Sequence, residues 1–148
     1  MKFSCSIEIE LSREKVVELF DNPDNLNKWQ DGFVSFEHLS GMPGQQGAKN
    51  KLVYKSRKHV IELTETILAN NLPDDINCLY EHKHMVNTMR SSFTPTAPNK
   101  TKYKIEIGYT KFIGFMPKMM ALLMPGVFKK QTQKWVNQFK AFAEKTAQ

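Results

Sequence analysis

The side chain with the clearest chemical potential is a carboxylate set in an apolar alternation. Glu65 is separated by even numbers of residues from Ile61, Leu63 and Ile67, so on a strand all four side chains point to the same face. If that face is inward, the carboxylate is partly buried and needs either hydrogen-bond partners or a proton. Glu65 is therefore the first candidate for a functional group.

Two roles for Glu65 remain open at this stage. As an acid/base or ligand-binding group it would be paired with His82 or Tyr80. As a structural group it would bond a neighbouring hydroxyl such as that of Tyr54. We favour the structural role, because one carboxylate without a nucleophile or a metal is thin support for catalysis.

His82 and His84 are two residues apart on an expected strand and resemble half of a metal site. A catalytic zinc needs a third protein ligand, and the sequence contains neither an HExxH motif nor paired cysteines to provide one. We therefore expect no metal and no tightly held cofactor, and His84 is expected to lie in a hairpin turn.

The elements that must position these side chains are mostly strands. Residues 3–9 alternate apolar with polar side chains, and two short helices are expected at 12–20, capped by Ser12, and at 26–29. Further strands are expected at 33–39, 52–57, 59–68, 76–83, 86–94 and 101–109. This alternation predicts an antiparallel sheet with one packed face and one wet face.

The last third of the chain, residues 112–145, is predicted to be helical. An aromatic stripe follows one side of its second half: Phe128, Thr132, Trp135, Phe139 and Phe142. The first half is apolar nearly all round and is expected to be buried on most sides, with Pro117 marking a helix start and Pro125 a kink or break. Such a helix needs a concave surface, which the sheet can supply.

Length and cysteine content favour a simple organisation. The 148 residues predict one domain over 1–148. Cys5 and Cys78 are too few for a disulfide framework and are interpreted as small buried hydrophobes in a reducing compartment. Residues 1–10 carry acidic side chains where a signal peptide would have its apolar run, so we expect a cytoplasmic protein.

The net charge of +6 resides in the last third. Residues 1–110 hold 14 Lys or Arg and 14 Asp or Glu, whereas residues 111–148 hold seven Lys and only Glu144. A solvated helix face is the favoured interpretation, and a weak contact with an anionic membrane through Lys129, Lys130 and Lys134 is the alternative. Nucleic acid is not an expected partner, because no recognised binding motif accompanies the charge.

The order of these elements, together with several short segments, resembles a known superfamily. The segments are DNPDNLNKWQ at 21–30, EHLSG at 37–41, Gly47 at the opening of the third strand, LTETI at 63–67 and MALLMPG at 120–126. They resemble the START-like or polyketide cyclase superfamily, also called SRPBCC, over essentially the whole chain.

The resemblance implies an α+β helix-grip fold. In that fold a curved seven-stranded antiparallel sheet wraps a long C-terminal helix in the order β-α-α-β-β-β-β-β-β-α, and two short helices close one end of a cavity. Members include lipid and hormone carriers, aromatase/cyclases, hydrolase-like proteins and chaperone activators, so the fold does not settle the function.

A set of candidate ligand-binding residues follows from strand parity and from the helix that faces the sheet. They are Trp29, Tyr54, Glu65, Tyr80, His82, Asn87, Met89, Tyr109, Met120, Met124 and Trp135. Trp29 is expected to plug the end of the cavity, and the methionines are expected to be core residues that also suit varied apolar ligands. A mainly apolar pocket with a few polar groups is typical of a small-molecule site.

The sequence thus predicts a protein that binds a hydrophobic small molecule, lipid-like or aromatic, between sheet and C-terminal helix. One alternative is a cyclase/dehydrase- or hydrolase-type enzyme that uses Glu65 with His82 or Tyr80 as acid/base. The other is a peripheral membrane or protein-interaction module that acts through the lysine face of the C-terminal helix.

Overall fold

A computed structural model describes residues 1–123 and 125–148 of the chain. For residues 116, 120, 121, 123 and 125 it describes the backbone alone.

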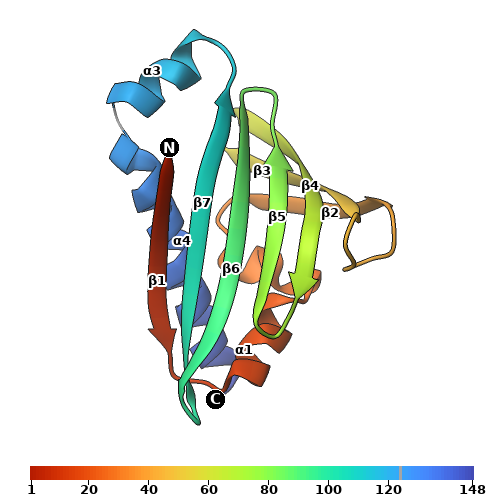
Figure 1. Ribbon diagram of the computed structural model, residues 1–148, viewed down its shortest axis with the longest axis vertical. Helices are drawn as coiled ribbons and strands as arrows, with labels where there is room; N and C mark the ends of the chain where they lie inside the picture. The colour runs from red at the N-terminus through yellow and green to blue at the C-terminus, as the bar shows by residue number, and fades with distance from the viewer. Residues whose placement is uncertain (124) are drawn as a thin grey trace.

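All strands belong to one seven-stranded antiparallel sheet with the order β1-β7-β6-β5-β4-β3-β2. The strands are β1 (Lys2–Ile9), β2 (Phe33–Ser40), β3 (Lys49–Ser56), β4 (His59–Asn71), β5 (Asp75–Glu81), β6 (Met85–Ala97) and β7 (Lys100–Phe112). From β2 to β7 each strand pairs with the next one in the sequence, and β1 pairs with β7. The chain therefore forms a long meander whose outer strand β1 comes from its beginning (Figure 1).

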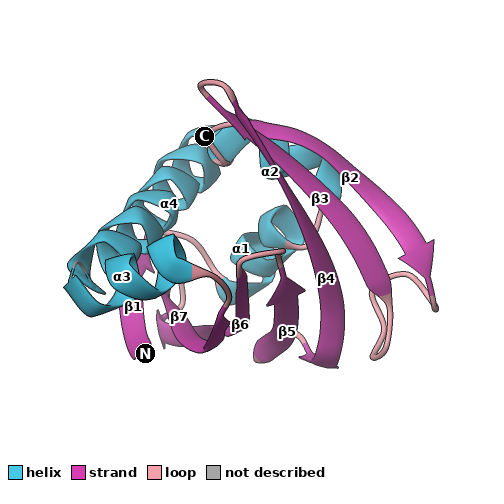
Figure 2. Cartoon of the chain, turned by 90° about the horizontal axis from the view of Figure 1, so that it is seen from above, coloured by secondary structure: helices cyan, strands magenta, loops and turns pink. Residues whose placement is uncertain are grey.

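The helices lie on one side of the curved sheet. They are α1 (Arg13–Phe20), the 3-10 helix η1 (Pro23–Asn25), α2 (Leu26–Trp29), α3 (Phe115–Leu123) and the long α4 (Pro125–Thr146). Figure 2 shows the sheet bending around α1, α2 and α4, so that these helices lie inside the curve. This is the predicted helix-grip architecture, and the expected α+β class and element order are confirmed, except that the C-terminal third forms two helices.

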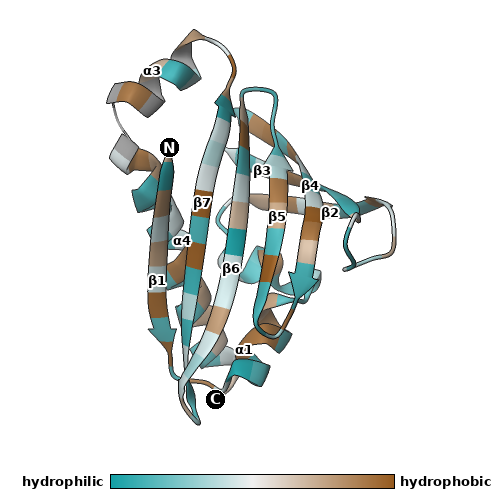
Figure 3. Cartoon of the chain, viewed as in Figure 1, coloured by the Kyte–Doolittle hydropathy of each residue, from teal (hydrophilic) through white to brown (hydrophobic). Residues whose placement is uncertain are grey.

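Alternation along the strands separates the two faces of the sheet, as the banded colouring of the strands in Figure 3 shows. On β7 the side chains of Thr101, Tyr103, Ile105 and Ile107 are buried, while the intervening ones are more exposed. The stripe predicted for α4 also holds, because Thr132 and Phe139 are buried and Phe128, Trp135 and Phe142 are half-buried.

Aromatic side chains join α4 to the sheet and to the short helices. Phe139 is 0% exposed, and its ring centroid lies 5.1 Å from that of Trp29, 5.4 Å from Tyr103 and 5.9 Å from Phe20. Each pair meets edge to face, a favourable geometry for aromatic rings. This cluster closes one end of the space between sheet and helix, so the sequence-based expectation that Trp29 plugs this end agrees with its position.

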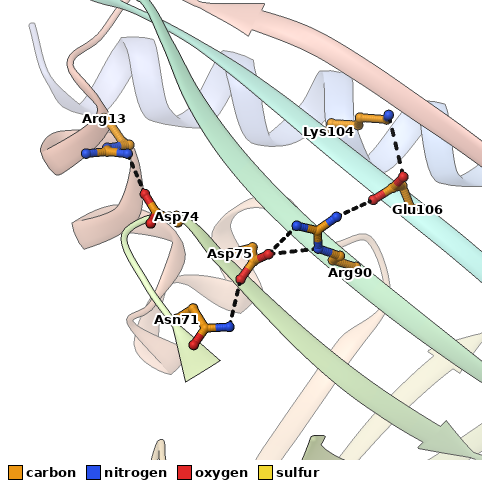
Figure 4. A network of polar contacts seen from close by, with 7 residues as sticks. All are labelled: Arg13, Asn71, Asp74, Asp75, Arg90, Lys104 and Glu106. Atoms are coloured by element: carbon orange, nitrogen blue, oxygen red, sulfur yellow. Dashed lines mark hydrogen bonds and ion pairs between the residues drawn. The ribbon is translucent and has the colours of Figure 1, made fainter. Parts of the chain in front are cut away.

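A polar network lies on the face of the sheet that points away from α4 (Figure 4). Arg90 on β6 pairs with Asp75 on β5 and, at 3.2 Å, with Glu106 on β7. Near the turn between β4 and β5, Arg13 of α1 pairs with Asp74 at 2.7 Å. The Arg90 contacts connect β5, β6 and β7 on the side of the sheet that faces away from α4, and the Arg13 contact joins α1 to the turn.

Most strands are longer than the sequence patterns predicted, but β5 ends at Glu81 instead of Lys83, so His82 lies beyond the strand on which it was expected. β3 begins at Lys49 instead of Leu52, and β4 continues to Asn71 instead of ending at Leu68. β6 passes through Pro95, beyond its predicted end at Thr94. A register irregularity between Pro95 and Ala97 accommodates the proline, in keeping with the preference of proline for bulges. Pairing with neighbouring strands extends β3, β4 and β6 beyond their locally apolar parts.

One expectation for the C-terminal third is wrong. The segment predicted to be buried on most sides exposes Phe115 by 77% and Leu122 by 80%. The helix start expected at Pro117 is found, because α3 begins at Phe115 and Pro117 lies in its first turn, where a proline loses no intrahelical bond. The break expected at Pro125 agrees with the end of α3 at Leu123 and the start of α4 at Pro125.

Phe139→Ala should lower the free energy of unfolding by about 3–5 kcal/mol, because it removes a fully buried ring that nothing nearby can replace. Phe115→Ala is the matched control, and its effect should stay within about 0.5 kcal/mol because that ring is exposed. Urea denaturation of both variants measures the difference. Equal losses would show that α4 does not depend on the Phe139 cluster.

Candidate functional site

A cavity of about 560 Å³ lies between the sheet and the first half of α4. Helix α4 contributes Phe128, Gln131, Thr132 and Trp135 to its lining. Further along the same helix, Val136, Phe139 and Ala143 are fully buried in the core. The helix therefore closes the core with its second half and bounds the cavity with its first half.

The structure brings together the predicted ligand-binding residues that it describes. Those that line the cavity are Trp29, Tyr54, Glu65, Tyr80, His82, Asn87, Met89, Tyr109 and Trp135. The side chain of Met120 and the whole of Met124 lie outside the described residues. That these side chains bind a ligand remains a prediction.

The polar groups of the cavity wall form one row across the sheet. Strand register places Asn50 opposite Glu65, Glu65 opposite Tyr80, Tyr80 opposite Asn87, and Asn87 opposite Tyr109. All five side chains line the cavity. Because residues directly opposite each other in a ladder have adjacent side chains on the same face, the row is continuous from β3 to β7.

An apolar row runs beside this polar row. Ile67 on β4 lies opposite Cys78 on β5, Cys78 lies opposite Met89 on β6, and Met89 lies opposite Ile107 on β7. All four residues line the cavity. The wall thus offers a broad apolar surface crossed by a narrow polar band.

Glu65 lies within the polar row and is hydrogen-bonded through both oxygens. The Asn50 amide donates to Oε1 at 3.0 Å, and the Tyr80 hydroxyl donates to Oε2 at 2.6 Å. Asn50 is only 3% exposed, so its amide is a fixed donor. These two bonds occupy one acceptor position on each oxygen of a half-buried carboxylate.

His38 on β2 extends this chain of contacts. The Asn50 amide nitrogen donates to Glu65, so its Oδ1 faces His38 Nδ1, at 3.1 Å, while His38 Nε2 lies 2.8 Å from the Gly41 carbonyl oxygen. Both of these oxygens are acceptors, so a ring nitrogen of His38 that carries a proton donates to the oxygen beside it. His38 thereby holds Asn50 in the orientation in which its amide donates to Glu65.

Tyr54 has a different partner from the one considered for it. Its hydroxyl donates to Gln30 Oε1 at 2.7 Å, and its ring stacks on Trp135 with centroids 5.9 Å apart. Burial and the nearby Glu65 charge raise the pKa of Tyr54. The expected Glu65–Tyr80 pairing is therefore found, whereas the Glu65–Tyr54 bond is not.

The histidine pair lies in the turn between β5 and β6. The His82 Nδ1 atom accepts a hydrogen bond from the His84 backbone N–H at 3.3 Å, and the two rings lie 5.4 Å apart. Burial, followed by the neighbouring His84 and Lys83, lowers the pKa of His82. Among the residues that the structure describes, no group of three or more His, Cys, Asp or Glu side chains is placed to hold a metal ion.

The cysteines are free and buried. Cys78 lines the cavity, and burial, assisted by the Glu65 charge, raises its pKa to about 12. Because the thiolate is the nucleophilic form of cysteine, Cys78 serves as an apolar wall residue.

The lysine face of α4 is only partly free. Lys134 pairs with Asp31 at 3.0 Å, whereas Lys129 and Lys130 are exposed. The weak membrane contact proposed for these three residues stays a prediction. In the described part of the chain, no helix is long and apolar enough to cross a membrane.

The sequence patterns missed several polar residues of the cavity lining, among them Gln30, His38 and Asn50. Asn50 has the same parity as Tyr54, but the predicted strand began at Leu52. Extending that alternation by one step would have placed Asn50 on the inner face. No local signal identifies His38 or Gln30, because their roles depend on partners 12 and 24 residues away.

Several solved structures have the same arrangement of helices and strands. The Zhui aromatase/cyclase from Streptomyces sp. R1128 has a TM-score of 0.83 at 9% identity, covering 100% of this chain and 96% of its own. Ara h 8.0201 has a TM-score of 0.76 at 12% identity, covering 97% of each chain. A START superfamily protein from Mycobacterium smegmatis has a TM-score of 0.69 at 13% identity, covering 93% of this chain and 97% of its own.

The chain has the START-like fold. The similarity lies in the backbone, because every identity among these structures is at most 13%. No protein-family model matches the sequence, and no curated protein matches it significantly. Within the START-like fold, the function has to be argued from the residues of the cavity.

The tyrosines give a test of this geometry. Burial is the first cause that raises the pKa of all four tyrosines, Tyr54, Tyr80, Tyr103 and Tyr109, and the Glu65 charge adds to it for Tyr54 and Tyr80. In the unfolded chain these phenols ionise at about pH 10. The native chain then holds more protons, so the free energy of unfolding should fall as pH rises above about 10.

Tyrosinate absorbance measured during alkaline titration checks this expectation. The folded protein should develop its signal at higher pH than the same protein in denaturant. Coincident titration curves, with the protein still folded by circular dichroism, would contradict the burial of these phenols.

Proposed function

We propose that this protein binds a hydrophobic small molecule, lipid-like or aromatic, in the cavity between the sheet and α4. The observation that carries the proposal is the cavity itself, about 560 Å³ in volume, with apolar walls and one polar row. Small-molecule sites have volumes of about 300–1,000 Å³ and combine apolar walls with a few oriented polar groups.

The apolar wall supplies affinity in this proposal. Side chains such as Ile67, Met89 and Ile107 line the cavity, and each Å² of ligand surface that they remove from water stabilises the complex by roughly 25 cal/mol. The polar row then sets the orientation of the bound molecule. One end of the ligand would carry a polar group that meets the row, and its remainder would be apolar.

A cyclase/dehydrase- or hydrolase-type enzyme is the second candidate. The bond of 2.6 Å from the Tyr80 hydroxyl to Glu65 favours it, because an oriented carboxylate beside a hydroxyl can take part in proton transfer. The similarity to an aromatase/cyclase is consistent with this candidate. Glu65 would be the base and Tyr80 its partner, whereas His82 lies in the hairpin turn, bonded by the His84 backbone.

Turnover assays distinguish the enzyme from the binding protein. If the protein is an enzyme, Glu65→Gln should lower the rate on an aromatic polyketide or ester substrate by about 10²–10⁴-fold, because it removes proton transfer. If the protein only binds, the wild type should show no turnover of these compounds. We expect the second result.

Binding of the apolar dye N-phenyl-1-naphthylamine should saturate at one site per chain. Met89→Trp should weaken it by at least about tenfold, because the indole fills cavity volume. Thr88→Trp is the matched control: it places the same ring on the next residue of β6, opposite Gly108 and on the other face of the sheet. Fluorescence titration measures both, with circular dichroism confirming the fold.

The control should bind the dye as the wild type does. Unchanged binding in a folded Met89→Trp variant would place the dye elsewhere and remove the support for this cavity as the site.

A further inference from the structure

We propose that the cavity selects ligands by hydrogen-bond donation: its ligand carries a hydroxyl or amine that donates to Glu65, and anionic ligands are disfavoured. This inference rests on the proposed function, because it names the class of molecule that the same cavity binds. It follows from three features of the wall: the open acceptor positions of Glu65, the engagement of nearby donors, and the charges of the lining residues.

Glu65 has unused capacity to accept hydrogen bonds. A carboxylate offers about four acceptor positions on its two oxygens. Asn50 occupies one on Oε1, and Tyr80 occupies one on Oε2. Since Glu65 lines the cavity, the remaining positions are available to a donor on a bound molecule.

Three polar groups near Glu65 already donate to protein atoms. The Tyr80 hydroxyl donates to Glu65, the Tyr54 hydroxyl to Gln30, and the Asn50 amide to Glu65. The indole N–H groups of Trp29 and Trp135 are buried, and neither has a hydrogen-bond partner among the described protein atoms. Beside Glu65 the wall therefore presents acceptor oxygens to a ligand, because the Tyr80 and Asn50 donors are already directed at the carboxylate.

The charges of the lining point the same way. Among the described residues that line the cavity, Asp21 and Glu65 are acidic and none is Lys or Arg. The lining also contains His38 and His82, and burial lowers the pKa of His82, which favours its neutral form. The lack of Lys and Arg among these described residues contrasts with the net charge of +6 of the whole chain.

His38 holds the partner of the carboxylate in place. Its two ring nitrogens contact the Asn50 Oδ1 and the Gly41 carbonyl oxygen, so both are engaged within the protein. The Asn50 amide is thereby kept directed at Glu65 Oε1, and the open acceptor positions of the carboxylate keep a fixed direction.

Two dyes with one skeleton test the charge selectivity. N-phenyl-1-naphthylamine is neutral and has an N–H donor, and 8-anilino-1-naphthalenesulfonate adds one permanent negative charge to the same rings. The wild type should bind the neutral dye more tightly. Glu65→Gln keeps the shape of the side chain and removes its charge. It should reduce the ratio of the dissociation constant of the anionic dye to that of the neutral dye by at least about tenfold.

Glu62→Gln is the matched control. Glu62 lies on the same strand but on the opposite face, is exposed, and pairs with Lys51 at 3.6 Å. The substitution changes the net charge of the protein as Glu65→Gln does, so the ratio of dissociation constants should stay within about twofold of the wild-type value if the effect belongs to the cavity.

A second measurement tests donation on the wild-type protein without relying on any variant. At pH 7, 2-naphthol is neutral and has a hydroxyl donor, whereas 2-methoxynaphthalene has the same rings without the donor. The ether is the more apolar molecule, so apolar burial alone predicts that it binds more tightly. We expect the naphthol to displace N-phenyl-1-naphthylamine at a concentration at least about tenfold lower, as a hydrogen bond to a charged acceptor allows.

The outcomes separate this inference from the proposed function. If the neutral dye fails to bind the wild type, both proposals fail. The selectivity is wrong, and the cavity simply binds apolar molecules, in either of two cases. In the first, the neutral dye binds but 2-methoxynaphthalene displaces it at the same or a lower concentration than 2-naphthol. In the second, Glu65→Gln leaves the ratio of the two dye dissociation constants unchanged.

Discussion

The structure depends on the packing of α4 against the concave face of the sheet. Phe139 is the centre of that contact, because it meets Phe20 of α1, Trp29 of α2 and Tyr103 of β7. Removing these rings from water is the main source of stability at this end of the fold. At the other end of the inner space, the sheet and the first half of α4 bound the cavity.

The same helix therefore has two roles along its length. Near its C-terminal end Val136, Phe139 and Ala143 are fully buried, and the core is closed. Nearer its N-terminal end Phe128, Thr132 and Trp135 line the cavity. A ligand site placed beside a rigid core keeps its walls in position before binding, which reduces the ordering cost that a ligand must offset.

The polar row is the point at which the cavity departs from a simple apolar pocket. A carboxylate on an inward face is costly unless it is hydrogen-bonded, and Glu65 has partners on both neighbouring strands. The partners are themselves held, Asn50 by His38 and the strands by the ladder. Such a connected set fixes the orientation of the charge, so its remaining acceptor positions are presented in a defined direction.

The sequence by itself determined the fold class and most of the cavity wall. Alternation along the strands identified the inner faces, including Tyr54, Glu65 and Tyr80, because side-chain direction on a strand depends on parity alone. Spacing along the last helix identified Phe139 and its stripe in the same way. Both patterns are local periodicities, so they can be identified from the amino-acid sequence without knowledge of the tertiary contacts.

Tertiary structure alone decided which polar groups meet. The Asn50–Glu65 and Tyr80–Glu65 bonds each join residues 15 positions apart, and the Tyr54–Gln30 bond joins residues 24 apart. Such pairs depend on strand register, which is set by the whole ladder and its irregularities and not by either residue. The exposure of Phe115 and Leu122 was decided in the same way, because an apolar segment is buried only where the fold provides a surface to cover it.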